Sequence, residues 1–128
     1  MYCLDTNVII DFLRNKKEII NKINNLQKEG KISVTTISLC ELYKGLHLSN
    51  RAQNELFILD NFAQSVKILD LNWQICRKFG EMYNRLEKNG RMINELDIMI
   101  ASITEANNVT LITQDKDFKN MGIRVKIW

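Results

Sequence analysis

Four acidic side chains lie where elements of structure begin or end, and their types and spacing could support chemistry. They are Asp5, Glu41, Asp97 and Asp115, and Asp117 follows two residues after the last of them. Clustered carboxylates raise one another's pKa and destabilise a fold unless a cation offsets their repulsion. Oxygen ligands without cysteine or histidine favour hard cations, which polarise water and stabilise charge on a phosphodiester. The pattern therefore predicts an acidic site for Mg²⁺ or Mn²⁺.

Each of these carboxylates also has a purely structural interpretation. Asp5 follows a buried strand, where an Asx turn is common, and Asp115 could cap the turn that comes after it. Glu41 lies three residues after Ser38, which is the spacing of a helix-capping box. Asp97 complements a helix dipole, but it stands in a run of apolar residues, where an unpaired carboxylate is costly to bury. The residues alone leave both interpretations open.

The hydrophobic pattern predicts strands and helices in alternation. Short apolar or β-branched runs indicate strands at 2–4, 32–35, 66–69, 109–112 and 124–127. Apolar residues recur at helical spacing over 8–13, 19–29, 38–46, 56–63, 73–89 and 96–106. The last of these helices is apolar on most sides, which predicts a central position. Strands separated by helices form parallel sheets covered on both faces.

We therefore expect one α/β domain spanning residues 1–128, a three-layer α/β/α fold with a short, mostly parallel sheet of four or five strands. In such folds the ligand site lies beyond the carboxyl ends of the strands. Asp5 and Asp115 each end a predicted strand, and Glu41 and Asp97 lie in the first turns of two helices that otherwise look buried. This architecture would bring the four carboxylates to one edge of the sheet.

Composition narrows the class of protein. The chain has 128 residues, of which 45% are hydrophobic, so it can bury a core and is not a disordered tail. A net charge of +3 permits a nucleic-acid partner without requiring one. No apolar run approaches the roughly 20 residues of a membrane span, and no secretory signal is recognisable. Three scattered cysteines and a single histidine, His47, argue against a zinc site and suit a reducing, cytoplasmic location.

Four segments together resemble the PIN domain, and most of all the VapC toxins of prokaryotic toxin–antitoxin pairs. They are the L-D-T-N of residues 4–7, S-L-C-E-L-Y-K-G of 38–45, D-I-M-I-A of 97–101 and L-I-T-Q-D-K-D-F of 111–118. The resemblance covers essentially the whole chain and implies an endoribonuclease that depends on Mg²⁺ or Mn²⁺. Asp5, Glu41 and Asp97 match the family's first three acidic positions. Asp115 matches the fourth and is preferred to Asp117, which could bind a second ion or orient a water.

The resemblance also implies roles for polar neighbours of these carboxylates. Thr6 and Asn7 are expected to make hydrogen bonds to a carboxylate or to the scissile phosphate, and Ser38 and Thr113 to support the carboxylates. The mechanism it implies is in-line attack by water, leaving a 5′-phosphate and a 3′-hydroxyl. Asp5, Asp97 and Asp115 would hold one ion directly or through waters, and Glu41 would help with a second ion or the attacking water.

The implied partners are an RNA substrate, a small VapB-like antitoxin and a second copy of the chain. If the chain forms a homodimer, a single copy would have an exposed apolar surface around Ile19–Leu26 or Trp73–Leu86, which the second copy would cover. Basic residues near the acidic segments could hold phosphates, although each one alone is better explained as solvated surface; they are Arg14, Lys16, Lys17, Lys44 and Arg91. The aromatic residues Trp73, Phe79 and Tyr83 recur at helical spacing, which favours core positions, and His47 is expected in packing or on the surface.

Other activities fit the sequence less well. A haloacid-dehalogenase-like hydrolase needs D-x-D after its first strand, where this chain has Asp5-Thr6-Asn7. A response-regulator receiver needs paired acids and a late lysine, which are absent from the pattern. A PIN-domain nuclease that processes RNA outside a toxin system, or a catalytically silent binding module, remains as an alternative.

Overall fold

The computed structural model describes residues 1–48 and 53–128, and its centre is a parallel sheet of five strands. The strands are β1 (Tyr2–Leu4), β2 (Ile32–Thr35), β3 (Lys67–Leu69), β4 (Thr110–Thr113) and β5 (Val125–Ile127). They lie in the order β3-β2-β1-β4-β5, with every neighbouring pair parallel. The predicted α/β fold is confirmed, and β1 and β4, which precede two of the candidate carboxylates, are adjacent.

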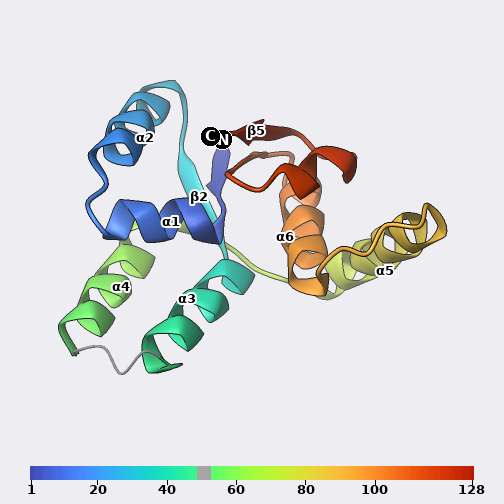
Figure 1. Cartoon of the computed structure of the whole chain (residues 1–128), viewed down its shortest axis with the longest axis horizontal. Coiled ribbons are helices and arrows are strands. Elements are labelled where there is room, and N and C mark those ends of the chain that lie inside the picture. Colours follow the sequence, from blue (N-terminus) through green and yellow to red (C-terminus); the bar gives the residue numbers. More distant parts are fainter. Residues whose placement is uncertain (49–52) are drawn as a thin grey trace.

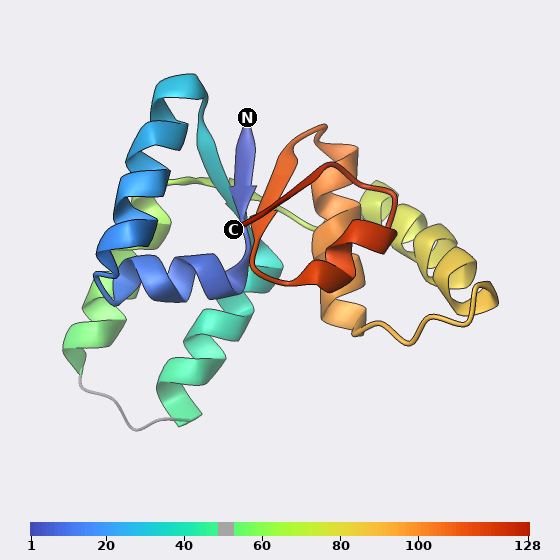
Figure 2. The ribbon, with the colours of Figure 1, turned by 45° about the horizontal axis from the view of Figure 1, so that its top comes forward.

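Helices cover both faces of this sheet (Figure 1). They are α1 (Thr6–Leu13), α2 (Lys17–Glu29), α3 (Thr36–Leu48), α4 (Gln53–Ser65), α5 (Trp73–Lys88) and α6 (Glu95–Ala106), with a 3₁₀ helix η1 (Lys116–Asn120). Figure 2 shows α1 to α4 on one side of the strands and α5 and α6 on the other. No helix in the described ranges is long and apolar enough to cross a membrane.

Alternation along the central strands divides the core in two. Cys3 of β1 and Leu111 of β4 belong to the cluster that includes α5 and α6. Leu4 and Ile112, one residue further along each strand, belong to the cluster that includes α1 to α4. Successive side chains of a strand point to opposite faces, so two-sided burial explains why these strands are continuously apolar.

Helix α6 occupies the central position that its sequence predicts. Six of its residues are buried: Ile98, Ile100, Ala101, Ser102, Ile103 and Thr104. Its two buried hydroxyl groups donate to carbonyl oxygens of the preceding turn, Ser102 to Ile98 and Thr104 to Ala101. Because these groups are satisfied within the helix, α6 can pack against the sheet on several sides without leaving a polar atom unpaired.

Several predicted details need correction. Helix α3 begins at Thr36, two residues before the predicted start, and α4 extends beyond its predicted range at both ends. Trp73 was expected in the core with Phe79 and Tyr83, yet its side chain is 71% exposed because it is the first residue of α5. The apolar face around Ile19–Leu26 packs into the core, so it offers no surface to a second copy.

Candidate active site

Asp5 lies at the centre of the acidic site. It ends β1 and caps α1, with Oδ1 accepting from the backbone N–H of Thr6 at 2.8 Å. Its Oδ2 accepts from the hydroxyl of Thr113 at 2.6 Å. The residue is only 4% exposed, and among the described residues no lysine or arginine forms an ion pair with it. Burial, with the charges of Glu41 and Asp115, raises its pKa against the opposing effect of the two hydrogen bonds.

The end of β4 brings the fourth carboxylate to the same edge. The Thr113 hydroxyl that donates to Asp5 also accepts from the backbone N–H of Asp115 at 3.0 Å. Asp115 in turn caps η1, its Oδ1 accepting from the N–H of Asp117 at 2.8 Å. The predicted cap at Asp115 is therefore confirmed, but the residue also faces Asp5 closely enough to raise that group's pKa.

Glu41 reaches the site through Thr6 rather than through a capping box. The Thr6 hydroxyl donates to Glu41 Oε1 at 2.8 Å and lies 3.1 Å from Ser38 Oγ. The predicted Ser38–Glu41 box is wrong because α3 starts earlier. The N–H of Ser38 is bound by the hydroxyl of Thr35, at 3.0 Å. Thr35, a threonine at the junction of strand and helix, is a supporting residue that the motif search missed, although its type and position are typical of a cap.

Asp97 comes from the opposite side of the sheet, in the first turn of α6. Burial, together with the charges of Asp5, Asp115, Glu41 and Asp117, raises the pKa of Asp97 to about 7. Its carboxylate accepts no hydrogen bond from any side chain or N–H in the described ranges, since the cap of α6 is Asn94. The charges of Glu41 and Asp115 thus act on Asp5 and on Asp97, and the charge of Asp5 acts on Asp97.

The other predicted residues fall into two groups. Thr6, Ser38 and Thr113 contact the acidic site as described, and Asp117 acts on Asp97 through its charge. Asn7 is exposed, and within the described part of the chain its side chain makes no hydrogen bond. Among the basic candidates, Lys16 pairs with Asp11 at 3.4 Å, whereas Lys17, Lys44, Arg91 and the surface residue His47 are exposed.

The donor set suits a hard divalent cation. It consists of carboxylate oxygens alone, and burial together with neighbouring carboxylate charges raises the pKa of both Asp5 and Asp97. A divalent cation would relieve that repulsion, and oxygen ligands select Mg²⁺ or Mn²⁺. However, in residues 1–48 and 53–128 no three acidic, histidine or cysteine side chains already stand at ligand spacing. A cation would therefore be held partly through waters or would draw the carboxylates together.

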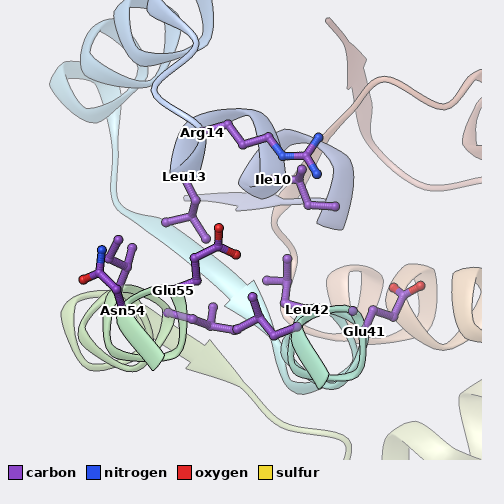
Figure 3. A pocket seen from close by; sticks show the side chains of 11 residues that line it. Ile10, Leu13, Arg14, Glu41, Leu42, Asn54 and Glu55 are labelled. Atoms are coloured by element: carbon purple, nitrogen blue, oxygen red, sulfur yellow. The ribbon is translucent and has the colours of Figure 1, made fainter. Parts of the chain in front are cut away.

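An apolar groove of about 550 Å³ leads away from the site between α1, α3 and α4. Glu41 stands at its end nearest the carboxylates, while Leu13 and Leu42 line its length (Figure 3). Arg14 projects along the same opening. The floor is open at Gly45, where an added Cβ would meet no atom within 4 Å. The groove therefore offers apolar contacts along Leu13 and Leu42 and charged contacts at Arg14, Glu41 and Glu55, which suits a peptide segment with both apolar and charged side chains.

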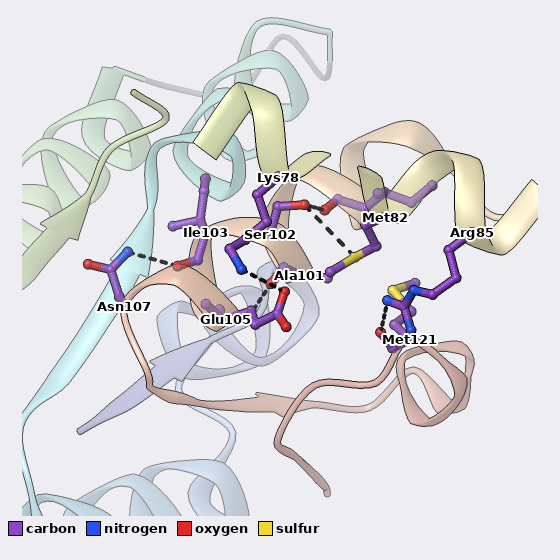
Figure 4. Close-up of polar contacts among 11 residues, drawn as sticks. Lys78, Met82, Arg85, Ala101, Ser102, Ile103, Glu105, Asn107 and Met121 are labelled. Carbon is purple, nitrogen blue, oxygen red and sulfur yellow. Dashed lines mark hydrogen bonds and ion pairs between the residues drawn. The ribbon is translucent and has the colours of Figure 1, made fainter. Parts of the chain in front are cut away.

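On the other side of the sheet, α6 is held firmly against α5. Lys78 of α5 pairs with Glu105 of α6 at 3.5 Å, and the Ser102 hydroxyl lies 3.9 Å from the sulfur of Met82 (Figure 4). Arg85 donates to the carbonyl of Met121 at 2.9 Å, which ties α5 to the segment after η1. These contacts fix the helix that carries Asp97, although they do not touch its carboxylate.

Comparison with known proteins agrees with this geometry. The family model described as the PIN domain matches residues 2–123. The chain belongs to the PIN domain family. This PIN domain is 32% identical to the protein named Ribonuclease VapC1 of Haemophilus influenzae over 94% of the chain and 92% of that protein. It is 26% identical to the tRNA(fMet)-specific endonuclease VapC of Shigella flexneri, covering 99% of the chain and 97% of the relative.

Solved structures give the same assignment. A chain in the crystal structure of VapBC2 from Rickettsia felis, bound to a DNA fragment from its promoter, superposes with a TM-score of 0.90 at 30% identity. The match covers 99% of this PIN domain and 98% of that chain. The resemblance drawn from four short segments is thereby confirmed over almost the full length.

Proposed function

We propose that this chain is an endoribonuclease that requires Mg²⁺ or Mn²⁺ and is the toxin of a VapBC-type toxin–antitoxin pair. The observation that carries the proposal is the acidic cluster, in which Asp5 and Asp97 are held among like charges without a basic partner in the described residues. Relatives of matching length are named ribonucleases or endonucleases. A cluster of carboxylates that repel one another is the arrangement that a divalent cation stabilises.

The roles of the residues follow from their contacts. Asp5, Asp97 and Asp115 would hold the ion, directly or through waters, and Glu41 would complete the acidic cluster. The bound ion would neutralise phosphodiester charge and make a nearby water more acidic. Thr6 and Thr113 keep Glu41 and Asp5 in fixed orientations by donating to their carboxylates. Such donors commonly change metal affinity or activity 10–100-fold when they are removed.

The groove between α1, α3 and α4 is the proposed seat of the antitoxin. A VapB-like partner would lay an apolar segment along Leu13, Leu42 and Ile58, and a basic side chain at its end would meet Glu41. A cation in that position would compensate the same charges as a metal ion. The antitoxin would therefore inhibit by occupying the acidic site as well as by covering it.

The decisive experiment is cleavage of total cellular RNA by the purified protein in Mn²⁺ or Mg²⁺. Parallel reactions contain EDTA or the Asp97→Asn variant, and Glu105→Gln, which also removes a charge from α6, serves as the matched control. We expect discrete fragments with 5′-phosphate ends from the wild type and from Glu105→Gln only. Purified initiator tRNA belongs among the substrates, because one relative is named for tRNA(fMet).

Other results would select the alternatives. Cleavage that persists in EDTA would refute metal dependence. Failure of a folded protein to cut RNA or to bind Mn²⁺ would favour a catalytically silent binding module. Cleavage that an antitoxin-like partner does not inhibit would favour an RNA-processing nuclease outside a toxin system.

A further inference from the structure

A hydrogen bond between Gln114 and Asp11 lies beside the site, and the roles described so far do not use it. Gln114 Nε2 donates to Asp11 Oδ2 at 2.8 Å, and Lys16 Nζ lies 3.4 Å from the same oxygen. The bond from Gln114 is the main cause that lowers the pKa of Asp11. Asp11 is therefore a charged acceptor, and hydrogen bonds to charged acceptors are stronger than those between neutral groups.

Three successive side chains at the end of β4 are engaged in different directions. Thr113 donates to Asp5, Gln114 donates to Asp11, and Asp115 caps the N–H of Asp117. Asp5 is the N-cap of α1, and Asp11 lies in its second turn. The end of β4 is thus tied to α1 at two points, although the paired residues are more than 100 positions apart in the chain.

The bond from Gln114 to Asp11 opposes the repulsion between Asp115 and Asp5 at a point that the bond from Thr113 to Asp5 does not hold. Asp5 and Asp115 are linked through the Thr113 hydroxyl, which donates to Asp5 Oδ2 at 2.6 Å and accepts from the Asp115 N–H at 3.0 Å, so two like charges lie beside each other. Like charges push the turn that carries Asp115 away from α1. Backbone hydrogen bonds from Asp5 N–H to Ile112 O at 2.9 Å and from Trp128 N–H to Thr113 O at 2.8 Å hold the strand itself. Gln114 is the first residue beyond β4, and its bond to Asp11 holds the turn that carries Asp115 against α1.

We propose that Gln114 and Asp11 are a positioning pair that fixes the carboxylate of Asp115 relative to that of Asp5. The pair presets the spacing of two proposed metal ligands without touching the metal. The consequence for metal binding rests on the proposed function, but the positioning itself does not.

An exchange of the two functional groups tests the pair. Asp11→Asn and Gln114→Glu are each isosteric. Gln114→Glu alone places two carboxylates face to face and removes the donor. The double variant restores a hydrogen bond with the polarity reversed, from Asn at position 11 to Glu at position 114. Gln64→Glu, on the exposed face of α4, adds the same charge elsewhere and is the control.

The first measurement is amide hydrogen exchange at Asp115 and Asp117 in protein without metal. Their N–H groups are held by Thr113 Oγ1 and Asp115 Oδ1, so they report directly on the turn. We expect Gln114→Glu to speed exchange at both amides about tenfold, the value of one good hydrogen bond. The double variant should return to within about threefold of the wild type, and Gln64→Glu should match it.

The second measurement is the dissociation constant for Mn²⁺ by calorimetry. We expect it to rise about five- to tenfold in Gln114→Glu and to recover in the double variant, in line with other supporting contacts of metal ligands. Unchanged exchange in Gln114→Glu, or no recovery in the double variant, would overturn the proposal. The proposal would also be overturned if amide exchange rises in Gln114→Glu and recovers in the double variant while the Mn²⁺ dissociation constant stays the same in all variants. If the wild type binds no Mn²⁺ yet exchange follows the pair, the positioning holds and the proposed metal dependence fails.

Discussion

The carboxylates of the acidic site come from both sides of the sheet, and hydrogen bonds hold those from one side more firmly than the one from the other. From the side of α1 to α4, Asp5 and Glu41 are already engaged by the hydroxyl groups of Thr113 and Thr6. From the side of α5 and α6, Asp97 brings a carboxylate with a pKa of about 7 and no hydrogen bond to it from the described residues. The fold alone therefore orients Asp5 and Glu41, whereas the orientation of the Asp97 carboxylate depends on a bound ligand.

The two sides also differ in their surfaces, because within the described residues only the first has an open groove beside the acidic site. The first side keeps an apolar groove of about 550 Å³ open beside Glu41. On the second side, the Lys78–Glu105 ion pair joins α5 to α6, and the bond from Arg85 to the Met121 carbonyl joins α5 to the segment after η1. We infer that binding is a property of the first side and rigidity a property of the second. Each of the following experiments strengthens or breaks this contrast.

The largest effect is expected from Asn and Ala variants of Asp5 and Asp97. All four should lose RNA cleavage by at least about 100-fold, because each removes a charge that the cation needs. The difference in unfolding free energy between the Ala and Asn variants should be larger at position 5 than at position 97. Asp5→Ala should unfold about 1–2 kcal/mol more easily than Asp5→Asn, because the Asn oxygen still accepts from the Thr6 N–H and the Asn amide can donate to the Thr113 hydroxyl.

At Asp97 the Asn and Ala variants should be equally stable within about 0.5 kcal/mol, since no donor there is left without a partner. Urea denaturation without metal measures all four. Equal differences at the two positions would show that the fold holds both carboxylates alike, and the contrast between the two sides would be lost.

A bulky residue in the groove should separate inhibition from catalysis. Gly45→Trp places a side chain into open space on the floor of the groove. We expect its affinity for the antitoxin to fall at least thirtyfold, about 2 kcal/mol, with cleavage of RNA retained. Gly80→Trp on α5, where an added Cβ also meets no atom, is the matched control. Equal antitoxin affinities for the two variants, measured by calorimetry, would place the antitoxin elsewhere.

The Thr113 hydroxyl joins the two carboxylates of the first side, and its removal should have a moderate effect. Thr113→Val loses the donor to Asp5 and the acceptor for the Asp115 amide, at a cost of roughly 1–3 kcal/mol and about tenfold in cleavage rate. Thr104→Val removes a buried hydroxyl that donates to a carbonyl within α6. That control should lose stability without losing activity. A matching loss of activity in both variants would mean that the hydroxyl of Thr113 acts only through folding.

The last prediction concerns the pH dependence of stability without metal. Because the pKa of Asp97 is raised from 3.8 to about 7, the folded state holds a proton there that the unfolded state has released. Stability should therefore fall as pH rises from about 4 to 7 and then level off. We expect a contribution of about 2 kcal/mol, less than the full shift implies, because water reaches this half-buried group.

Comparison with Asp97→Asn isolates this contribution, since Asp5 titrates with the same sign in both proteins. Urea midpoints at pH 4.5 and 7.5 in EDTA measure it. A fall of the same size in the Asn variant would assign the effect to other groups. Saturating Mn²⁺ should remove the fall in the wild type.

Much of this molecule could be predicted from local patterns. Buried strands such as Leu111-Ile112 and the apolar helix of Ile98–Ile103 have a periodicity that belongs to their own segment, so their existence and type were right. The resemblance of short segments around Asp5 and Asp97 also located the carboxylates. Only the ends of elements shifted, because a cap depends on a few polar contacts rather than on periodicity.

What could not be predicted depends on pairs of residues far apart in the chain. Ser38 and Glu41 have the spacing of a capping box, but Glu41 binds Thr6, which is 35 residues away. Trp73 fits an apolar stripe on a helical pattern, yet its place at the start of α5 leaves it exposed. Gln114 has no motif of its own, and its partner on α1 is visible only in the fold.

The bond from Thr113 to Asp5 spans 108 positions and has a consequence for synthesis. A chain emerging from the ribosome exposes Asp5 more than 100 residues before β4, which must pair with β1. N-terminal segments fold first during translation, and here they fold without the strand that orients Asp5. We expect a nascent chain still inside its ribosome to be inert toward the RNA around it. The capacity to cut RNA would then appear only after β4 has emerged and paired with β1.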